Sequence, residues 1–303
     1  MSLIIPDIIA NRCKIQRGDN LMLWILCSVV VFIAAIIIFF KIPYSKTMNR
    51  FRKDVQKHSE QSNLQSGVFS DQDIAFLPEP VQKHFRAAGY IGKPKMASIS
   101  AYMQSIPLRS SIHKPPMIID YTLHLFAYKP VRLAYIKTSV FGIPFEGYDS
   151  TQNGIGFMKG VIGKVITLFN QTGAEMDKAQ LLTYLGECFL FPSAVLSKYI
   201  AWEPIDATHV KAVITYKGVS GSGVFAFSSD GLLKSFYTDE RAQIQTGGKI
   251  NYPGWSAVFE DYRQEDGIWL PKNIKAVWHE EDGDLVYFNE NNLKIKFHIL
   301  DGG

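Results

Sequence analysis

The chain has 303 residues, 47% of them hydrophobic, so it is long enough to bury a sizeable core in one large domain or two small ones. Its formal net charge of +4 is uneven: residues 1–57 hold nine of the 32 Lys/Arg and three of the 28 Asp/Glu, which leaves 23 basic and 25 acidic residues beyond them. These counts exclude the basic face that a nucleic-acid-binding domain needs, and three widely spaced cysteines exclude a disulfide framework or a cysteine metal motif.

The first predicted element is a membrane-spanning helix over residues 21–40, after a short N-terminal tail of residues 1–20. The segment reads LMLWILCSVVVFIAAIIIFF and carries no charge. Twenty residues of helix are about 30 Å long, which matches the hydrocarbon thickness of a bilayer. The run is too long for the core of an ordinary signal peptide and no A-x-A-like cleavage site follows it. We therefore expect a retained, single-pass anchor in the cell membrane.

Residues 41–72 are predicted to form a basic juxtamembrane segment, a helical extension that ends in a linker. Its basic side chains are placed to contact lipid phosphates. They are Lys41, Lys46, Arg50, Arg52, Lys53 and Lys57. Only three basic residues precede the span within about twenty positions, and Lys/Arg bias orients short flanks toward the cytoplasm. This bias predicts a cytoplasmic domain.

A single α+β domain is predicted over residues 73–298. Its first helix lies in LPEPVQKHFRAAG, where Pro80 suits the first helical turn and Gly89 suits the position after the helix end. His84 lies on the apolar face of this helix, so we expect it to be a packed core residue rather than a metal ligand.

The segment from residue 95 to 161 alternates apolar and polar residues and is rich in β-branched and aromatic ones, as strands are. Asn153-Gly154 predicts the turn of a hairpin, because both residues tolerate positive φ. Glu146 and Asp149 are an odd number of residues apart, so on one strand they would point to opposite faces and could not act as a carboxylate pair.

The rest of the domain is predicted to contain two helices followed by strands. Thr172 and Glu175 have the spacing of a capping box that opens the first helix, and SAVLSKYI is predicted to be the second. Short turns such as SSDG, QEDG and EEDGD then separate the strands at the intervals of an antiparallel meander.

No motif of a known reaction is found. Gly163-Lys164 is the best candidate for a phosphate-binding loop, but Met158 replaces the first required glycine and Val165 replaces the magnesium-binding Ser or Thr. Neither a G-x-S-x-G nucleophile motif nor an H-E-x-x-H zinc motif occurs. We predict no cofactor and no metal ion.

The chain carries two family resemblances. The segments LPEPVQKHF, GYIGKPK, FGIPFEGYDS, GAEMDKAQLL and WEPIDATHVKA resemble an uncharacterised bacterial family of single-pass membrane proteins over roughly residues 73–297. The order of strand, turn and strand in GSGVFAFSSDGLLKSF and FEDYRQEDGIWLPKNIKAVW is similar to that of LolA-like lipoprotein carriers. That second resemblance implies a curved antiparallel half-barrel that packs on a few helices and encloses an apolar cavity. It also implies a domain outside the cell membrane, whereas the Lys/Arg bias favours the cytoplasm, so the sequence leaves both sides open.

The leading hypothesis is a membrane-anchored module that binds an apolar ligand, such as a lipid or an acyl chain. The candidate ligand-binding residues are Glu146, Tyr148, Trp202, Trp255, Tyr262 and Trp278. The alternative is a membrane-tethered scaffold for a protein partner, with a filled core. A hydrolase is the third hypothesis, and it would require an acidic residue to meet a basic one in a pocket. The candidates for that pair are Glu146, Asp149 or Asp261 with His279 or Arg241.

Overall fold

The computed structural model describes residues 5–62, 67–245 and 247–299, with side chains from Leu21 onward, and divides the chain into two compact units between Tyr44 and Ser45. The first unit contains helix α1 (Ile5–Lys41). This helix is long and apolar enough to cross a membrane, and its most apolar stretch, within the residues whose side chains are described, is not buried. The predicted continuous helix over residues 21–40 is confirmed.

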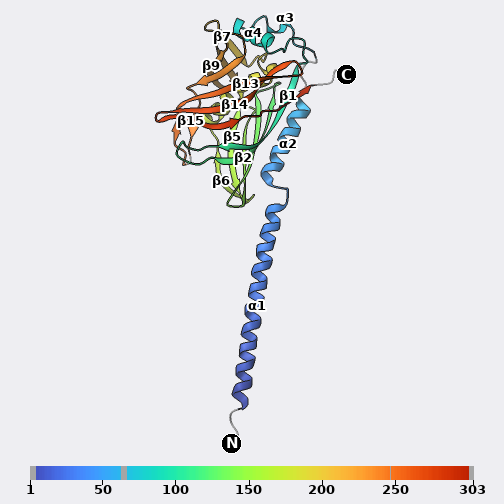
Figure 1. Cartoon of the computed structure of the whole chain (residues 1–303), viewed down its shortest axis with the longest axis vertical. Helices are drawn as coiled ribbons and strands as arrows, with labels where there is room; N and C mark the ends of the chain where they lie inside the picture. The colour runs from blue at the N-terminus through green and yellow to red at the C-terminus, as the bar shows by residue number, and fades with distance from the viewer. Residues whose placement is uncertain (1–4, 63–66, 246, 300–303) are drawn as a thin grey trace. The chain divides into compact units, whose positions relative to one another are not determined.

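The second unit contains one large antiparallel sheet with a few helices, so the predicted α+β class with a curved, open sheet is confirmed (Figure 1). Within the described residues, fourteen strands join in the order β6-β5-β4-β3-β2-β1-β15-β14-β13-β10-β9-β8-β7, and β16 pairs with β1. We call β1 to β6 the first wing and β7 to β10 with β13 to β15 the second wing. The wings join where Leu108 of β1 pairs with Phe288 of β15.

The strands of the first wing are β1 (Met96–Leu108), β2 (Met117–Phe126), β3 (Val131–Val140), β4 (Ile143–Gln152), β5 (Ile155–Ile162) and β6 (Ile166–Gln171). Those of the second wing are β7 (Ile200–Pro204), β8 (His209–Tyr216), β9 (Val219–Phe227), β10 (Leu233–Thr238), β13 (Gly254–Glu265), β14 (Ile268–Glu280) and β15 (Gly283–Glu290). The remaining strands are β16 (Ile295–Ile299) and the separate pair β11 (Gln243–Ile244) and β12 (Ile250–Asn251).

The described helices of the second unit are α2 (Lys46–Gln61), α3 (Asp71–Ile74), α4 (Glu79–Ala87), α5 (Ala174–Gly186) and the 3₁₀ turns η1 (Cys188–Leu190) and η2 (Pro192–Ala194). Helix α5 contacts β4 and β5 of the first wing and β8 and β9 of the second. Its residues from 179 to 186 are therefore buried throughout. This helix forms much of the interior between the wings.

Helix α2 covers the outer face of the first wing, where it contacts β2, β3 and β4. Its Phe51 stacks on Tyr135 with 5.4 Å between ring centroids and meets Tyr148 edge-on at 5.6 Å. These rings belong to a buried cluster with Phe126, Val131, Leu133 and Phe157. We call this cluster the α2 cluster. The apolar residues of an otherwise polar helix thus have a packing partner on the sheet.

Several local predictions are confirmed. Gln152 pairs with Ile155, and the two residues between them, Asn153 and Gly154, have φ of 56° and 78°, as a type I′ hairpin turn requires. In the predicted helix α4, Pro80 lies in the first turn and Gly89 has φ of 80° just beyond the end. His84 is buried, and its Nδ1 lies 3.0 Å from the carbonyl oxygen of Gly231.

Two predictions about helices are wrong. The N-cap of α5 is Gly173, with φ of 108° and no side-chain cap, so the cap lies one residue beyond the predicted one and Thr172 stays outside the helix. Glu175 accepts a hydrogen bond from the hydroxyl of Tyr252 instead of closing a capping box. The segment SAVLSKYI forms only the 3₁₀ turn η2 before β7 begins at Ile200, because Ile200 to Pro204 pair with β8.

Candidate functional site

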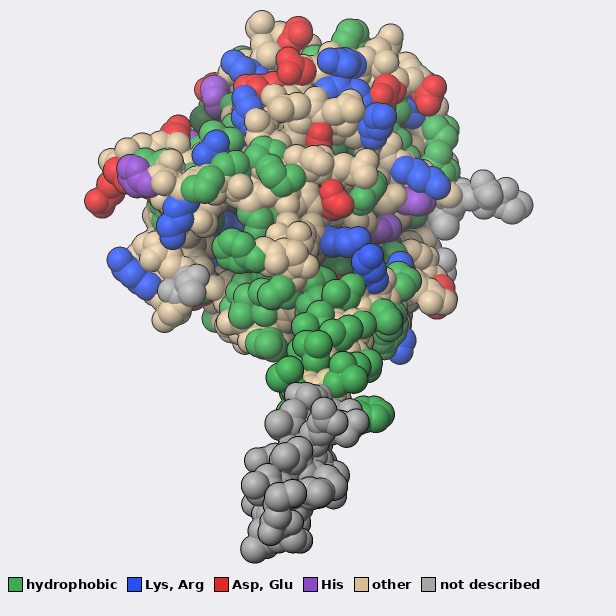
Figure 2. All heavy atoms as spheres, turned by 60° about the horizontal axis from the view of Figure 1, so that its bottom comes forward, with side chains coloured by type: hydrophobic (Ala, Val, Ile, Leu, Met, Phe, Trp, Pro, Cys, Tyr) green, Lys and Arg blue, Asp and Glu red, His purple; other side chains and the backbone are tan. Residues whose placement is uncertain are grey.

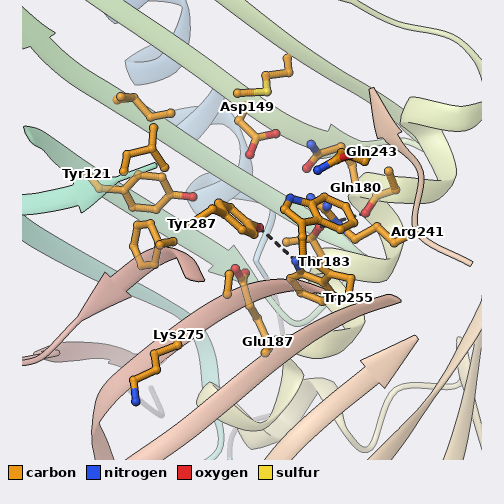
Figure 3. A pocket seen from close by; sticks show the side chains of 18 of the residues that line it. Tyr121, Asp149, Gln180, Thr183, Glu187, Arg241, Gln243, Trp255, Lys275 and Tyr287 are labelled. Atoms are coloured by element: carbon orange, nitrogen blue, oxygen red, sulfur yellow. Dashed lines mark hydrogen bonds between the residues drawn. The ribbon is translucent and has the colours of Figure 1, made fainter. Parts of the chain in front are cut away.

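A cavity of about 500 Å³ lies between the two wings and beside α5 (Figure 3). Its lining residues come from β1 to β6 and the loop after β1, from α5 and η1, from the segment after β10 and from β13 to β15. Alternation along the strands explains the first set, because Tyr121, Arg132 and Asp149 occupy inward-facing positions while their sequence neighbours face outward.

Most of the lining is apolar and adaptable. Four of the eight methionines of the chain line the cavity, together with aromatic side chains of the second wing. The methionines are Met103, Met117, Met158 and Met176. Unbranched methionine side chains can adjust to ligands of irregular shape. The walls therefore suit an apolar chain better than a compact polar molecule.

Arg132 organises a polar region in this cavity. Its Nε and Nη2 donate to the two carboxylate oxygens of Glu187 at 2.8 and 3.0 Å, and its Nη1 donates to Oδ2 of Asp149 at 2.9 Å. Nη2 also donates to the hydroxyl of Tyr121 at 2.7 Å. Bidentate pairing of this kind is strong and fixes the planes of both groups.

The neighbouring side chains in this region stabilise each other's protonation states. Burial alone would lower the pKa of Arg132, but Glu187, Tyr121 and Asp149 outweigh it and raise that pKa well above its ordinary value. Arg132 therefore stays charged although its surface is almost completely buried. Burial also raises the pKa of Tyr121, so this phenol stays neutral. Glu187 caps the C-terminus of α5, where the helix dipole disfavours a negative charge that Arg132 offsets.

Arg241 supplies a second guanidinium to the cavity. Its Cζ lies 4.7 Å from the ring centroids of both Trp255 and Trp278, and its Nε donates to the hydroxyl of Thr183 at 2.9 Å. Trp255 in turn donates from its indole nitrogen to the hydroxyl of Tyr287 at 3.1 Å, the dashed line in Figure 3. Trp255 and Trp278 are paired across β13 and β14, and cation–π contact with both rings restrains the guanidinium.

Two acceptor atoms in this lining are buried without a hydrogen-bond partner among the residues that the structure describes. They are Oδ1 of Asp149 and Oε1 of Gln180. Gln180 is only 2% exposed, and the amide nitrogen of its side chain has only the weak acceptor Sδ of Met176, at 3.5 Å. A buried polar atom without a partner is destabilising by about 1–3 kcal/mol, so a donor in the cavity would be favourable at both atoms.

The predicted ligand-binding residues lie in three different places. Trp255 and Trp278 line the cavity. Glu146 and Tyr148 lie on the opposite face of the same sheet, in contact with Tyr135 and with Asp54 of α2 respectively. Trp202 donates to the carbonyl oxygen of Val195, and Tyr262 donates to that of Leu233; neither of them lines the cavity.

The acidic and basic residues named for a hydrolase are also separated. The register between β3 and β4 is continuous, so Glu146 and Asp149 keep opposite faces as predicted. Asp149 and Arg241 both line the cavity, whereas Asp261 does not. His279 contacts Asp284 and Ser256 outside the cavity. No group of three His, Cys, Asp or Glu suited to a metal ion occurs among the described residues.

Arg132, Gln180 and Glu187 are not among the site residues predicted from the sequence. Arg132 gave the strongest signal, because it interrupts VRLAYI, a strand whose two faces are otherwise apolar. A charge in such a strand requires a buried partner. Its partner Glu187 is 55 residues away, and nothing in the local pattern connects the two.

The six basic residues near the membrane helix all have exposed side chains. Arg50 places its guanidinium carbon 4.5 Å from the ring centroid of Phe157 and its Nε 3.8 Å from Asp54. The others are Lys41, Lys46, Arg52, Lys53 and Lys57. Packing of α2 on the sheet thus leaves these charges accessible.

Three solved structures are similar to this chain. One is a LolA superfamily protein from Nitrosomonas europaea, with 12% identity and a TM-score of 0.38, covering 74% of this chain and 94% of that one. The second is a domain named as an outer membrane lipoprotein-sorting protein from Vibrio parahaemolyticus, with 12% identity, a TM-score of 0.35 and coverage of 66% and 85%. The third is a DUF1329 family protein from Desulfovibrio piger, with 11% identity, a TM-score of 0.34 and coverage of 75% and 95%.

A comparison of the chain with curated proteins finds no match. A family profile does match, over residues 67–290, which is most of the second unit and well over half of the chain. The sequence-based resemblance to an uncharacterised family is therefore confirmed, and the chain belongs to DUF6544, a family of unknown function.

Proposed function

We propose that this protein is a membrane-anchored module that binds a lipid with one long apolar chain and an uncharged, hydroxylated head group. The observation that carries the proposal is the cavity of about 500 Å³, which has apolar walls and one polar region. Pockets of small-molecule-binding proteins have volumes of roughly 300–1,000 Å³ and combine apolar walls with a few polar groups.

The apolar walls supply most of the binding free energy in this proposal. Each methylene group that leaves water contributes about 0.8 kcal/mol, so a chain of a dozen carbons gives on the order of 10 kcal/mol before the entropy of binding is subtracted. The four methionines and the rings of Phe259 and Phe288 are the surfaces that such a chain would contact.

The polar region selects the head group. Arg132 and Arg241 balance Asp149 and Glu187 in the polar region. The lining also contains Lys275, which pairs with Glu260, and the exposed Arg109, so the polar region itself has no net charge that would attract a free phosphate. Oδ1 of Asp149 and Oε1 of Gln180 need donors, and a hydroxyl group supplies them. A glyceride-like head group fits this region. Its hydroxyl groups can donate to the two acceptors, and its ester carbonyl groups can accept from donors of the arginine side chains.

The anchor in this proposal is α1, followed by the exposed basic residues of α2. Anionic lipids of the inner leaflet attract such residues by about 1 kcal/mol per side chain near the surface. The domain lies on the cytoplasmic side in this proposal, as the same Lys/Arg bias favours. Labelling by an impermeant maleimide tests this side: after replacement of the three native cysteines, Ser229→Cys in the turn before β10 should stay unlabelled in intact cells. Labelling there would contradict the cytoplasmic assignment.

Native mass spectrometry of the full-length chain released from detergent micelles tests the binding function. We expect a co-purified lipid whose retention is lost in Ala276→Trp, because this variant places an indole in the cavity. Ala226→Trp is the matched control, since Ala226 is a half-buried alanine of β9 that does not line the cavity. Identification of the lipid by fragmentation then tests the head group.

Equal lipid retention in the wild type and in Ala276→Trp would place the lipid on the anchor helix and would contradict the proposal. Absence of any lipid from all three proteins would favour the scaffold function instead. A retained lipid with a charged phosphate or carboxylate head would keep the binding function but would overturn the proposed head-group chemistry.

A further inference from the structure

The turns of the first wing fall at two opposite ends, because consecutive hairpins of a meander alternate. One end holds the loop 109–116, the turn 141–142 and the turn 163–165, which are closed by the pairs Leu108 with Met117, Val140 with Ile143 and Ile162 with Ile166. We call it the portal end. The opposite end holds the turns that contain Lys129-Pro130 and Asn153-Gly154.

The portal end exposes apolar side chains where turns usually have polar ones. Phe141 is fully exposed, Val165 is 69% exposed and Ile166 is 60% exposed. Leu168 and Ile118, on the strands next to these turns, are each more than half exposed. In the surface view of Figure 2, charged side chains of both signs are spread over the upper part of the folded domain, and the hydrophobic side chains lower in the view include the exposed ones of α1. Contiguous exposure of this kind marks an interaction surface.

The exposed part of the cavity lining lies at the same end. Among its lining residues, those with exposed side chains are Arg109, Ser110 and Pro115, and all three belong to the loop 109–116. Met117, the next lining residue, begins β2 at this loop. A ligand that enters past this loop therefore passes beside the apolar turns.

Helix α2 begins toward the portal end. Its Phe51 stacks on Tyr135, its Asp54 accepts from Tyr148, and its His58 contacts Gln152 next to the opposite end. The helix thus runs in the same direction as β4, which starts at the portal end. Only residues 42–44 separate the end of α1 from Ser45, the N-cap of α2. The four Cα–Cα steps from Lys41 to Ser45 span at most about 14 Å, so anchoring of α1 in a bilayer would limit how far this end of the sheet can move from it.

We propose that the portal end is a membrane-contact surface through which the cavity exchanges lipid with the bilayer. The inference rests on the proposed anchoring of α1, and it adds a site and a route to the proposed binding function. Phe141, Val165 and Ile166 enter the boundary between head groups and acyl chains, while Arg109 and Lys114 in the neighbouring loop meet lipid phosphates. Lipid then moves along loop 109–116 without crossing water.

Fluorescence quenching by brominated lipids tests this contact. The full-length chain, with Cys13, Cys27 and Cys188 replaced by alanine, carries one cysteine labelled with the fluorophore NBD. The test positions are Val165→Cys and Phe141→Cys, and the control is Ser229→Cys in a polar turn of the second wing. Each protein is reconstituted in vesicles of phosphatidylcholine and phosphatidylglycerol, with or without bromine on the acyl chains. Co-flotation with vesicles verifies anchoring.

We expect quenching at both test positions to exceed that at the control severalfold. Equal quenching at all three positions in a protein that floats with vesicles would overturn the membrane contact. A blue-shifted emission at Val165→Cys that brominated lipids do not quench would show that a protein covers this surface, and would overturn it as well.

The same measurement in Ala276→Trp separates the two proposals. The contact does not require an occupied cavity, so quenching should persist when this variant has lost its lipid. Lipid retention by the wild type without quenching at the portal end would leave the binding function in place and remove only the membrane contact. Quenching without lipid retention would leave the membrane contact in place and contradict the binding function.

Discussion

Strand β4 supplies alternate side chains to two regions of the domain that differ in packing. Tyr148 points outward into the α2 cluster, where Phe157 meets it edge-on with 4.9 Å between ring centroids. Asp149 points inward to a cavity of about 500 Å³. Both regions are largely apolar and both are buried, yet only the outer one is filled by its own residues.

The difference shows how one sheet can serve both stability and binding. The α2 cluster is filled because a helix lies directly on that face, and its aromatic rings contact one another. The inner face meets α5 and the second wing, whose spacing leaves a hollow. Buried polar atoms without a partner among the described residues occur on both faces, for example Oε2 of Glu146 outside and Oδ1 of Asp149 inside, so the unfilled volume is what distinguishes the inner face. Native interiors normally contain few voids, and the hollow is therefore the region suited to a ligand.

The largest effect should come from deleting one ring from each region. Phe157 of the α2 cluster and Phe259 of the cavity wall are both strand residues with 6% and 4% exposure. We expect Phe157→Ala to lower the free energy of unfolding by about 3–5 kcal/mol, and Phe259→Ala by roughly 1–2 kcal/mol less, because Phe259 already faces a void on one side. Urea denaturation of the full-length protein measures both. Equal losses would mean that the cavity wall is as tightly packed as the α2 cluster.

The sequence predicted the outer and inner faces of β4 but not what each face contacts. The odd spacing of Glu146 and Asp149 was sufficient to separate them, and Asn153-Gly154 was sufficient to place the hairpin, because both depend on local geometry. The partners depend on tertiary structure: Asp54 reaches Tyr148 from 94 residues away, and Glu187 reaches Arg132 from 55. The aromatic character of Trp255 and Trp278 is enough to make them ligand-binding candidates, but the volume of the cavity that they line depends on the separation of the wings.

Gly154→Val should destabilise both regions together, because the hairpin of β4 and β5 supplies side chains to the α2 cluster and to the cavity. Gly154 has φ of 78°, and an added Cβ would lie 2.6 Å from Cβ of Lys217. We expect a loss of about 2 kcal/mol, within the 1–3 kcal/mol typical of backbone strain. Asn153→Asp is the control, because Asp also tolerates positive φ. A thermal melt of Gly154→Val that matches the wild type would contradict the type I′ turn.

Lower pH should destabilise the packing of α2 on the outer face without changing lipid binding in the cavity. Burial lowers the pKa of His124, which lies edge-on to Phe51, to about 4, and burial also lowers the pKa of His58. In the unfolded chain these histidines bind protons near pH 6.5, whereas the folded protein binds them only at lower pH. The free energy of unfolding is therefore highest above pH 6.5 and falls progressively as the pH falls toward 4. For His124 alone the loss between pH 7.5 and pH 5.5 is about 1 kcal/mol. None of the residues that line the cavity is a histidine.

Hydrogen exchange of residues 46–61 at these two pH values measures this loosening, after correction for intrinsic rates. We expect faster exchange in α2 at pH 5.5, and a smaller change in His124→Gln, which removes one of the two titrating rings. Lipid retention should not differ between the two pH values. Loss of lipid at pH 5.5 in the wild type but not in His124→Gln would show that the two faces are coupled through the sheet.

The smallest expected effect concerns α5, the helix that borders the hollow face. Thr172→Ala should change the free energy of unfolding by less than about 0.5 kcal/mol, because Thr172 is exposed and lies outside a helix whose N-cap is Gly173. Asp177→Ala should lower it by about 1 kcal/mol, since Oδ1 of Asp177 accepts a 2.7 Å hydrogen bond from the backbone nitrogen of Gly156 in β5. Urea denaturation followed by tryptophan fluorescence compares the two. A larger loss in Thr172→Ala than in Asp177→Ala would mean that a local cap positions the helix. The expected order means instead that β5 positions it, so that the first wing sets both the filled cluster on its outer face and the distance to α5 on its inner one.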